Sequence, residues 1–238
     1  MRTSNHIYHH DNQVLHGYLA SNNPTDEQLP AVLVVHDWSG RNAFACQQAE
    51  MLAQLGYLGF AVDMYGEGRV GETNDEKQAL MQPLASHRNL LRARIRAALD
   101  AVMALKDVDQ HRIAVMGFCF GGLCALDLAR SGADIVGAVT FHGLLNKPQD
   151  IPNQPIKAKI LALHGYNDPM VTPADVNVFC QEMTEAGVDW QMHMYGNTQH
   201  AFTNPQAHDK ALGLIYNAQA SRRSFQALTD FLGELFSN

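Results

Sequence analysis

A cysteine lies at the centre of a glycine-flanked turn. The segment reads Gly117-Phe118-Cys119-Phe120-Gly121 and stands where a β-rich run ends and an apolar, helix-like run begins. Such a turn forces its central residue into strained backbone geometry, and the small flanking residues let the chain segments pass closely. The amino terminus of the following helix favours a thiolate. The pattern predicts that Cys119 is a nucleophile. The alternative is a small apolar cysteine packed in a tight turn.

An acid and a base follow in the order nucleophile, acid, base. Asp168 and His200 each come directly after a predicted strand, as Cys119 does. That order is the one found in α/β-hydrolases, and loops after parallel strands converge at one edge of a sheet. We expect a triad in which His200 takes the thiol proton and Asp168 orients the imidazole. Otherwise Asp168 starts a turn before Pro169, and His200 caps a surface loop.

An oxyanion hole needs two amide donors near the nucleophile. One should be the backbone amide of Phe120, the residue after Cys119. The early strand-to-helix loop contains Trp38, whose amide is the candidate second donor and whose side chain would line the pocket. The alternative for Trp38 is simple packing. The Gly-rich segment 65–73 also follows a strand and should form the rim, where Arg69 supplies positive charge or is merely solvated. Substrate contacts are therefore expected from Trp38, Arg69 and Phe120.

The composition excludes several classes of partner. The formal net charge is -7 and the pI is near 5.9, which disfavours nucleic acid and anionic lipid and favours a small-molecule substrate. The four cysteines form no metal or disulfide pattern, and the amino terminus lacks the apolar core of a secretory signal. No apolar run approaches the ~20 residues needed to cross a bilayer. We expect a soluble, cytoplasmic protein that is a monomer or a small homo-oligomer.

A metal site is a weaker reading of the twelve histidines. His36, His142, His164 and His200 each follow a predicted strand and could point toward one edge of the sheet. Zinc ligands usually include pairs at short local spacings, and none of these four lies within twenty residues of another. We therefore expect neither a metal nor another cofactor.

The alternation of strand-like and helix-like segments predicts one α/β domain over residues 1–238 with an α/β-hydrolase fold, a mostly parallel twisted sheet and helices on both faces. Strands are predicted at 31–35, 57–63, 112–116, 135–141 and 159–163, with an edge strand at 190–195. Residues 6–19 should form an opening strand or hairpin, interrupted at His16-Gly17. Helices are predicted at 42–55, 84–105, 121–130 and 174–186, and over about the last twenty residues.

With these residues assembled, the chain resembles the dienelactone hydrolase family over nearly its whole length. The resemblance rests on His36-Asp37-Trp38, the elbow 117–122 with cysteine where serine is usual, and the segments 164–169 and 200–205. It implies a cofactor-independent hydrolase that cleaves lactones or activated esters through a thioacyl-enzyme, with Cys119, Asp168 and His200 as the triad.

Two positions depart from the family pattern. An acidic residue on the early loop contacts the nucleophile in this family, and here Asp37 replaces the usual glutamate. We expect Asp37 to support Cys119, since a nearby carboxylate raises a thiol pKa; the alternative is a helix cap. Members that hydrolyse dienelactone resemble one another in an arginine four residues after the histidine. Here Asn204 stands in that place, so dienelactone is not the expected substrate.

Two other functions remain open at this stage. A hydrolase fold can serve as a non-catalytic small-molecule binding protein. An activated Cys119 could also act as a thiol-based redox sensor, with Cys124 about one helical turn further on.

Overall fold

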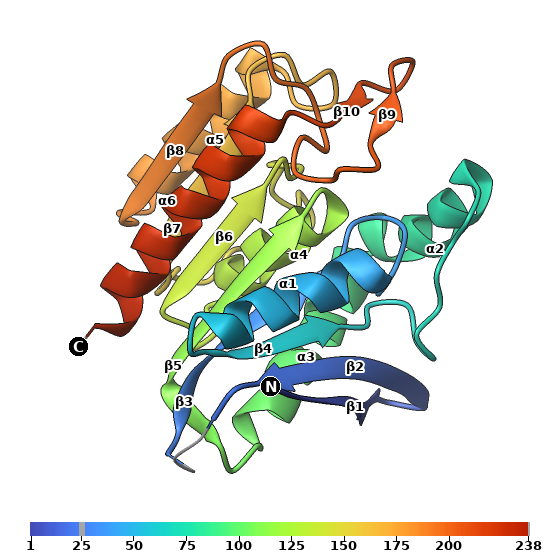
Figure 1. The fold of residues 1–238 in the computed structure, drawn as a ribbon. Coiled ribbons are helices and arrows are strands. Elements are labelled where there is room, and N and C mark those ends of the chain that lie inside the picture. Colours follow the sequence, from blue (N-terminus) through green and yellow to red (C-terminus); the bar gives the residue numbers. More distant parts are fainter. Residues whose placement is uncertain (24–26, 238) are drawn as a thin grey trace.

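A mostly parallel sheet forms the centre of the molecule, as the computed structural model shows for residues 1–23 and 27–237. Its eight strands lie in the order β1-β2-β4-β3-β5-β6-β7-β8 (Figure 1). β1 and β2 are antiparallel, and all strands from β4 to β8 run parallel to one another. The strands are β1 Arg2–His10, β2 Gln13–Ser21, β3 Leu29–Val35, β4 Leu58–Val62, β5 Val108–Phe118, β6 Gly137–Phe141, β7 Lys159–Gly165 and β8 Trp190–Tyr195. The predicted parallel α/β sheet is confirmed.

The opening segment is a hairpin, but its turn is not where the glycine suggested. The chain reverses at Asp11, whose φ is 51°, while His16 pairs with Ile7 inside the ladder. Gly17 also lies within β2. A Cβ at that position would overlap the ring of Phe60, so the packing requires glycine there. The expected interruption at His16-Gly17 is therefore wrong: the glycine makes room for a core aromatic ring.

Helices cover both faces of the sheet. α1 Ala43–Gln54 and α6 Ala218–Phe236 lie on the face turned to the viewer in Figure 1. α3 Arg88–Met103, α4 Phe120–Arg130 and α5 Pro173–Glu185 pack on the opposite face. Side chains alternate along each strand, so Leu33 of β3 joins the core under α3 and α4, and Val34 joins the core under α1 and α6.

The predicted helix 84–105 is two helices. α2 Asn74–Ala85 begins at a capping box formed by Thr73 and Glu76, and α3 starts only at Arg88. Between them Ser86 is the C-cap of α2: its backbone N–H and its hydroxyl both donate to the carbonyl oxygen of Gln82, at 3.0 and 2.6 Å, a contact that bends helices. Leu84 therefore belongs to the preceding helix, although its spacing from Leu91 suits a continuous one.

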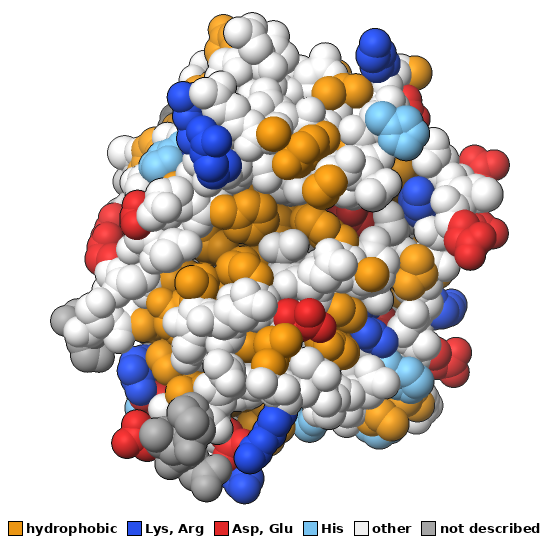
Figure 2. All heavy atoms as spheres, viewed as in Figure 1, with side chains coloured by type: hydrophobic (Ala, Val, Ile, Leu, Met, Phe, Trp, Pro, Cys, Tyr) orange, Lys and Arg blue, Asp and Glu red, His pale blue; other side chains and the backbone are white. Residues whose placement is uncertain are grey.

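Hydrophobic side chains gather in a hollow between α1 and α6 (Figure 2). The hollow has a volume of about 270 Å³ and lies beside Phe44, Met51 and Phe225. No helix that the structure describes is long and apolar enough to cross a membrane.

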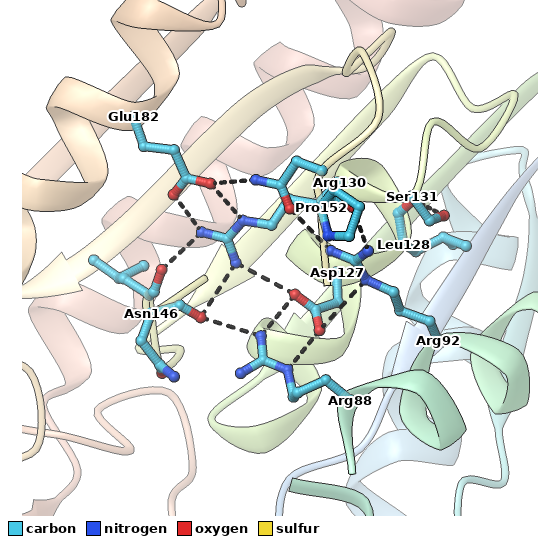
Figure 3. Close-up of polar contacts among 11 residues, drawn as sticks. Arg88, Arg92, Asp127, Leu128, Arg130, Ser131, Asn146, Pro152 and Glu182 are labelled. Atoms are coloured by element: carbon cyan, nitrogen blue, oxygen red, sulfur yellow. Dashed lines mark hydrogen bonds and ion pairs between the residues drawn. The ribbon is translucent and has the colours of Figure 1, made fainter. Parts of the chain in front are cut away.

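A buried group of charged side chains joins α3, α4 and α5 to the long segment between β6 and β7 (Figure 3). Arg130 is fully buried and contacts Glu182 through two hydrogen bonds of 2.9 and 2.7 Å. It also donates to the carbonyl oxygen of Leu145 at 2.8 Å, and Arg88 donates to that of Asn146 at 3.1 Å. These arginines supply the hydrogen bonds that a segment without regular structure cannot make for itself.

Candidate active site

The turn that carries Cys119 has the strained geometry expected of a nucleophile elbow. Cys119 has φ 53° and ψ -114° and is the residue directly before α4. A Cβ on Gly117 would overlap the carbonyl oxygen of Gly121, and one on Gly121 would overlap the carbonyl oxygen of Val35. The flanking glycines are therefore required by close backbone packing. The Cys119 amide donates to the carbonyl oxygen of Phe141 at 3.0 Å, which ties the turn to β6.

A cavity of about 540 Å³ opens beside this turn at the carboxyl edge of the sheet. One wall is α2 and the loop before it; another is a small flap, β9 His208–Asp209 and β10 Leu214–Ile215, which stands beyond the strand ends in Figure 1. Residues from several loops line the cavity, among them Asp37, Trp38, Lys77, Cys119, His142 and His200.

His200 and Asp168 form a buried pair next to Cys119. Nδ1 of His200 lies 2.6 Å from Oδ2 of Asp168, and both side chains are fully buried. The other Asp168 oxygen, Oδ1, accepts the backbone N–H of Met170 at 2.8 Å. The carboxylate is therefore fixed on one side and holds the imidazole on the other, which sets Nδ1 as the protonated nitrogen.

The remaining nitrogen of His200 is turned to Cys119. Nε2 is buried and faces the Cys119 side chain, whose hydrogen bond and charge both act on it. Burial alone would lower the pKa of His200, but the nearby charge of Cys119 and the hydrogen bond with Asp168 raise it to about 10. A cationic imidazole beside the sulfur is the state that this surrounding favours.

The early loop borders the same cavity as His200. Oδ1 of Asp37 accepts the backbone N–H of Ser39 at 2.8 Å, so this carboxylate also shapes its own turn. The carbonyl oxygen of Trp38 accepts the hydroxyl of Tyr65 at 2.9 Å, and the Trp38 side chain lines the cavity. Asp37 and Cys119 border the same cavity. Among the described residues, Asp37 makes a hydrogen bond with Ser39 and none with Cys119.

Phe120 and Arg69 are placed differently from expectation. The Phe120 side chain is fully buried and stacks against Tyr65, with ring centroids 6.0 Å apart, so only its backbone amide is left to face a substrate. The Arg69 guanidinium donates to the carbonyl oxygens of Gly66 and Tyr65 and is not among the described residues that line the Cys119 cavity. Neither side chain lines the Cys119 cavity, since one fills the core and the other closes its own loop; contact of these two residues with substrate stays a prediction.

Lys77 is a cavity residue that the sequence did not reveal. It comes from α2, which was not predicted, and its Nζ lies 5.6 Å from the centre of the Trp38 ring. Asn204 does line the cavity, and its Oδ1 accepts the N–H of Gln206 at 2.9 Å. The rim segment contributes Val70 and Gly71, as expected of a loop after a strand.

Asp63 is a second residue that motif reading missed. It is fully buried at the end of β4, and its carboxylate accepts four backbone N–H groups, those of His16, Tyr65, Gly66 and Gly68, at 2.8 to 3.0 Å. A buried charge is stabilised by several such donors. Asp63 thereby shapes the rim loop. An aspartate directly after an apolar strand and before a Gly-rich segment was the available signal.

The four histidines of the metal hypothesis do not assemble into a metal site. Nε2 of His36 accepts the backbone N–H of Met64 at 3.2 Å, and its Nδ1 lies 2.5 Å from the carbonyl oxygen of Asp37. His142 contacts His200 ring to ring. Across residues 1–23 and 27–237, no three His, Cys, Asp or Glu side chains are grouped so as to hold a metal ion.

Comparisons with known proteins agree on one family. The model of the dienelactone hydrolase family matches residues 15–236. A putative carboxymethylenebutenolidase of Aquifex aeolicus is 27% identical over 207 residues, which are 85% of this chain and 87% of that protein. The solved structure "m3DLH" is 35% identical, covers 99% of this chain and 98% of its own, and has a TM-score of 0.91. A dienelactone hydrolase-like promiscuous phosphotriesterase from metagenomic libraries is 33% identical with a TM-score of 0.92, over 98% of both chains.

Proposed function

The chain belongs to the dienelactone hydrolase family, and from that premise we propose that it cleaves a carboxylic ester or a lactone with Cys119 as nucleophile, His200 as base and Asp168 as the group that orients His200. The observation that carries the proposal is the buried 2.6 Å contact between Asp168 and His200 at the cavity where the strained Cys119 projects.

The reaction divides into two steps. His200 holds the thiol proton at Nε2, so that an imidazolium lies beside a thiolate, and the sulfur of Cys119 attacks the acyl carbon. Backbone amides, that of Phe120 and that of Trp38, would stabilise the tetrahedral oxyanion. The intermediate then collapses: the bond to the alcohol oxygen breaks, His200 gives its proton to that oxygen, and a thioester remains on Cys119. In the second step His200 removes a proton from water, which attacks the thioester carbon. The C–S bond then breaks, the carboxylic acid leaves, and His200 and Cys119 share the returned proton as before.

The charge of the cavity bears on the class of ester. Asn204 supplies no cation, Arg69 is held by its own loop, and Lys77 is the one Lys or Arg side chain lining the cavity among the described residues. Apolar groups such as Trp38, Phe44 and Leu214 lie in the same walls. We therefore expect esters or lactones with an apolar or aromatic portion to be turned over, and dienelactone itself to be a poor substrate.

A second candidate activity is hydrolysis of neutral phosphotriesters. Its support is the high similarity to the promiscuous phosphotriesterase together with a cavity that has little net positive charge. The same sulfur would attack phosphorus with loss of an aryl alcohol, and water would then have to release the phosphoryl group.

Redox sensing is less well supported than hydrolysis. Cys124 is fully buried in the core, and burial raises the pKa of its thiol well above the usual value. A thiol so placed is a poor partner for forming a disulfide with Cys119.

The test compares wild type with Cys119→Ala on p-nitrophenyl acetate, a set of aryl lactones and diethyl p-nitrophenyl phosphate. We expect turnover of at least one carboxylic ester or lactone, a burst of p-nitrophenol equal to the enzyme concentration, and an acetyl adduct on Cys119 by peptide mass spectrometry. Cys119→Ala should lose at least about 10³-fold in kcat. Full activity in Cys119→Ala would refute the nucleophile, and activity confined to the phosphate would favour the second candidate.

A further inference from the structure

His142 is a buried histidine that the proposed reaction does not use. It directly follows β6 and has φ 39°, a left-handed backbone conformation that is uncommon outside glycine. Its side chain is 2% exposed and yet borders the Cys119 cavity. Its backbone N–H donates to the carbonyl oxygen of Leu163 at 2.8 Å, so the position is fixed by the adjacent strand β7. Residues held in such conformations gather at functional sites.

The side chain of His142 joins the elbow region to the loop that carries His200. Nε2 of His142 lies 2.8 Å from Oγ1 of Thr203, a buried hydroxyl three residues after His200. The His142 ring also packs edge-on against the His200 ring, with centroids 5.1 Å apart and an angle of 64° between the planes. Phe202 and Phe118 close the other sides of the ring at 5.2 and 6.0 Å.

His200 needs a second restraint, because its known hydrogen bond fixes only one end of the ring. Nδ1 is held by Asp168, and the backbone carbonyl oxygen accepts the N–H of Ile215 at 3.0 Å. Nε2, the atom that must exchange protons with Cys119, interacts with that sulfur and has no other fixed partner within the described residues. A ring held at one nitrogen can still turn about that contact, which would move Nε2 away from the sulfur. The His142 ring packs against the His200 ring and therefore restricts such a rotation.

The contact between the His142 and His200 rings is possible because His142 is uncharged. Burial is the main cause that lowers the pKa of His142 well below its usual value, and the neighbouring charges of His200 and His164 act in the same direction. Its Nδ1 is buried and unpartnered within the described part of the chain. A neutral imidazole packs against the His200 cation without the repulsion that a second cation would bring.

We propose that His142 is a positioning residue: its ring and its hydrogen bond to Thr203 hold the His200 imidazole between Asp168 and Cys119. The inference rests on the proposed function, because it concerns the group that would move the protons. It adds a residue that belongs to neither the nucleophile, the acid nor the oxyanion donors. Misplacing a catalytic group by about 1 Å can cost up to 10²-fold in rate.

Several titratable groups face His200 and contribute to its pH dependence. Cys119 and Asp168 contact it directly, and His142 and His164 lie beside it. Asp37, Lys77, His208 and Asp209 border the same cavity. None of the substitutions below alters these groups except His142 itself, which is neutral.

The test removes the hydrogen bond between His142 and Thr203 by changing either partner. Thr203→Val keeps the shape and removes the hydroxyl, His142→Phe keeps a ring and removes the nitrogen, and Thr203→Ser restores the hydroxyl. We expect Thr203→Val and His142→Phe each to lower kcat for p-nitrophenyl acetate by about tenfold with KM nearly unchanged. The alkaline limb of kcat/KM should move to lower pH, since a loosened His200 loses part of the stabilisation of its cation. Thr203→Ser should behave as wild type.

The double variant decides between positioning and packing. If one hydrogen bond carries the effect, Thr203→Val with His142→Phe should cost no more than either change alone. Multiplying losses, or a wild-type rate and pH profile in Thr203→Val, would overturn the proposal. His111→Gln, on the exposed start of β5, is the matched histidine control and should leave kinetics unchanged.

Alkylation separates this proposal from the proposed function. The rate at which iodoacetamide modifies Cys119 reads the Cys119–His200 pair without any ester turnover, and it should fall several-fold at neutral pH in Thr203→Val. If wild type hydrolyses no ester or lactone but shows this change, the proposed function fails and the positioning role stands. Equal alkylation rates in all folded variants would remove the positioning role whatever the substrate. Circular dichroism and thermal melts establish which variants are folded.

Discussion

Arg88 of α3 and Asp127 of α4 face each other in the interior through two N–H···O hydrogen bonds of 2.6 Å each. Neither side chain is more than 7% exposed. Asp127 belongs to the helix whose first turn follows Cys119, so the pair connects the elbow helix to a neighbour that does not touch the cavity (Figure 3). Arg92 and Arg130 also approach Asp127, at 3.9 and 3.4 Å.

Removing the carboxylate should destabilise the fold strongly. Asp127→Asn leaves buried arginines without their shared anion, and breaking such a pair costs about 3–5 kcal/mol in the free energy of unfolding. Urea unfolding followed by circular dichroism measures the loss. Arg96→Met is the matched control, because the Arg96–Asp100 pair is exposed and worth less than about 1 kcal/mol. Equal losses in the two variants would contradict the role of burial.

Two glycines should respond oppositely to alanine. In Gly117→Ala the new Cβ would overlap the carbonyl oxygen of Gly121, and backbone cannot yield there. We expect little folded protein from this variant, and its Cys119 should not show the alkylation rate of the wild-type enzyme. Gly233 lies in α6 with no atom within 4 Å of a new Cβ, so Gly233→Ala should stabilise by about 0.5–1 kcal/mol. A soluble, active Gly117→Ala protein would show that the elbow can open.

The carboxylate of Asp37 can be tested apart from the turn that it forms. Asp37→Asn keeps an oxygen that accepts the Ser39 N–H but removes the charge, whereas Asp37→Ala removes both. If the charge acts on Cys119, the half-maximal rate of iodoacetamide alkylation should occur at lower pH in Asp37→Asn, because a negative neighbour disfavours a thiolate. If Asp37 is only a turn residue, Asp37→Asn will match wild type and Asp37→Ala alone will lose activity through loop disorder.

Stability should fall in acid because buried histidines must remain neutral. Burial lowers the pKa of His36, His142 and His164 in the folded state. Below the unfolded value of about 6.5 the unfolded chain therefore binds more protons, and stability is lost as pH falls. The raised pKa of His200 acts in the opposite sense: its contribution is present below about 6.5 and is lost as pH rises toward about 10. Maximal stability is expected near neutral pH.

His164→Gln isolates one of these protons. Each proton taken up on unfolding changes the free energy of unfolding by about 1.4 kcal/mol per pH unit. Urea unfolding between pH 7 and pH 5 should show a slope for His164→Gln that is shallower than that of wild type by up to one proton. His193→Gln, on the edge strand β8, should leave the slope unchanged. An unchanged slope in His164→Gln would show that this ring takes no part.

Local patterns predicted the strands and the proximity of Asp168 and His200 well. β3 is buried on both faces, and its sequence is a continuous apolar run. β8 is less buried and alternates, and its bounds equal the predicted 190–195. The turn at Cys119 could be identified because its flanking glycines avoid a backbone clash, and this requirement leaves a local pattern in the sequence. Asp168 and His200 could be paired in advance because each follows a parallel strand.

Other features depend on contacts that no short segment contains. His142 carries no motif, and its relation to His200 arises only when β6 and the loop after β8 are brought together. The break at Ser86 preserves helical spacing on both sides, so periodicity could not locate it. The direction of Arg69 was also unpredictable, since its partners are carbonyl oxygens of its own loop and carry no side-chain identity.

The floor and the walls of the cavity come from different parts of the fold. Cys119 and Asp168 leave strands that are buried on both faces, whereas Lys77, Gln206 and His208 come from α2 and the flap near β9. Changes in those walls leave the interior untouched, so a new preference for an ester can be acquired by surface substitutions at little cost in folding. The residues proposed for the reaction and the residues that select the ester therefore belong to different parts of the fold. Laboratory diversification should concentrate on residues 70–77 and 204–214.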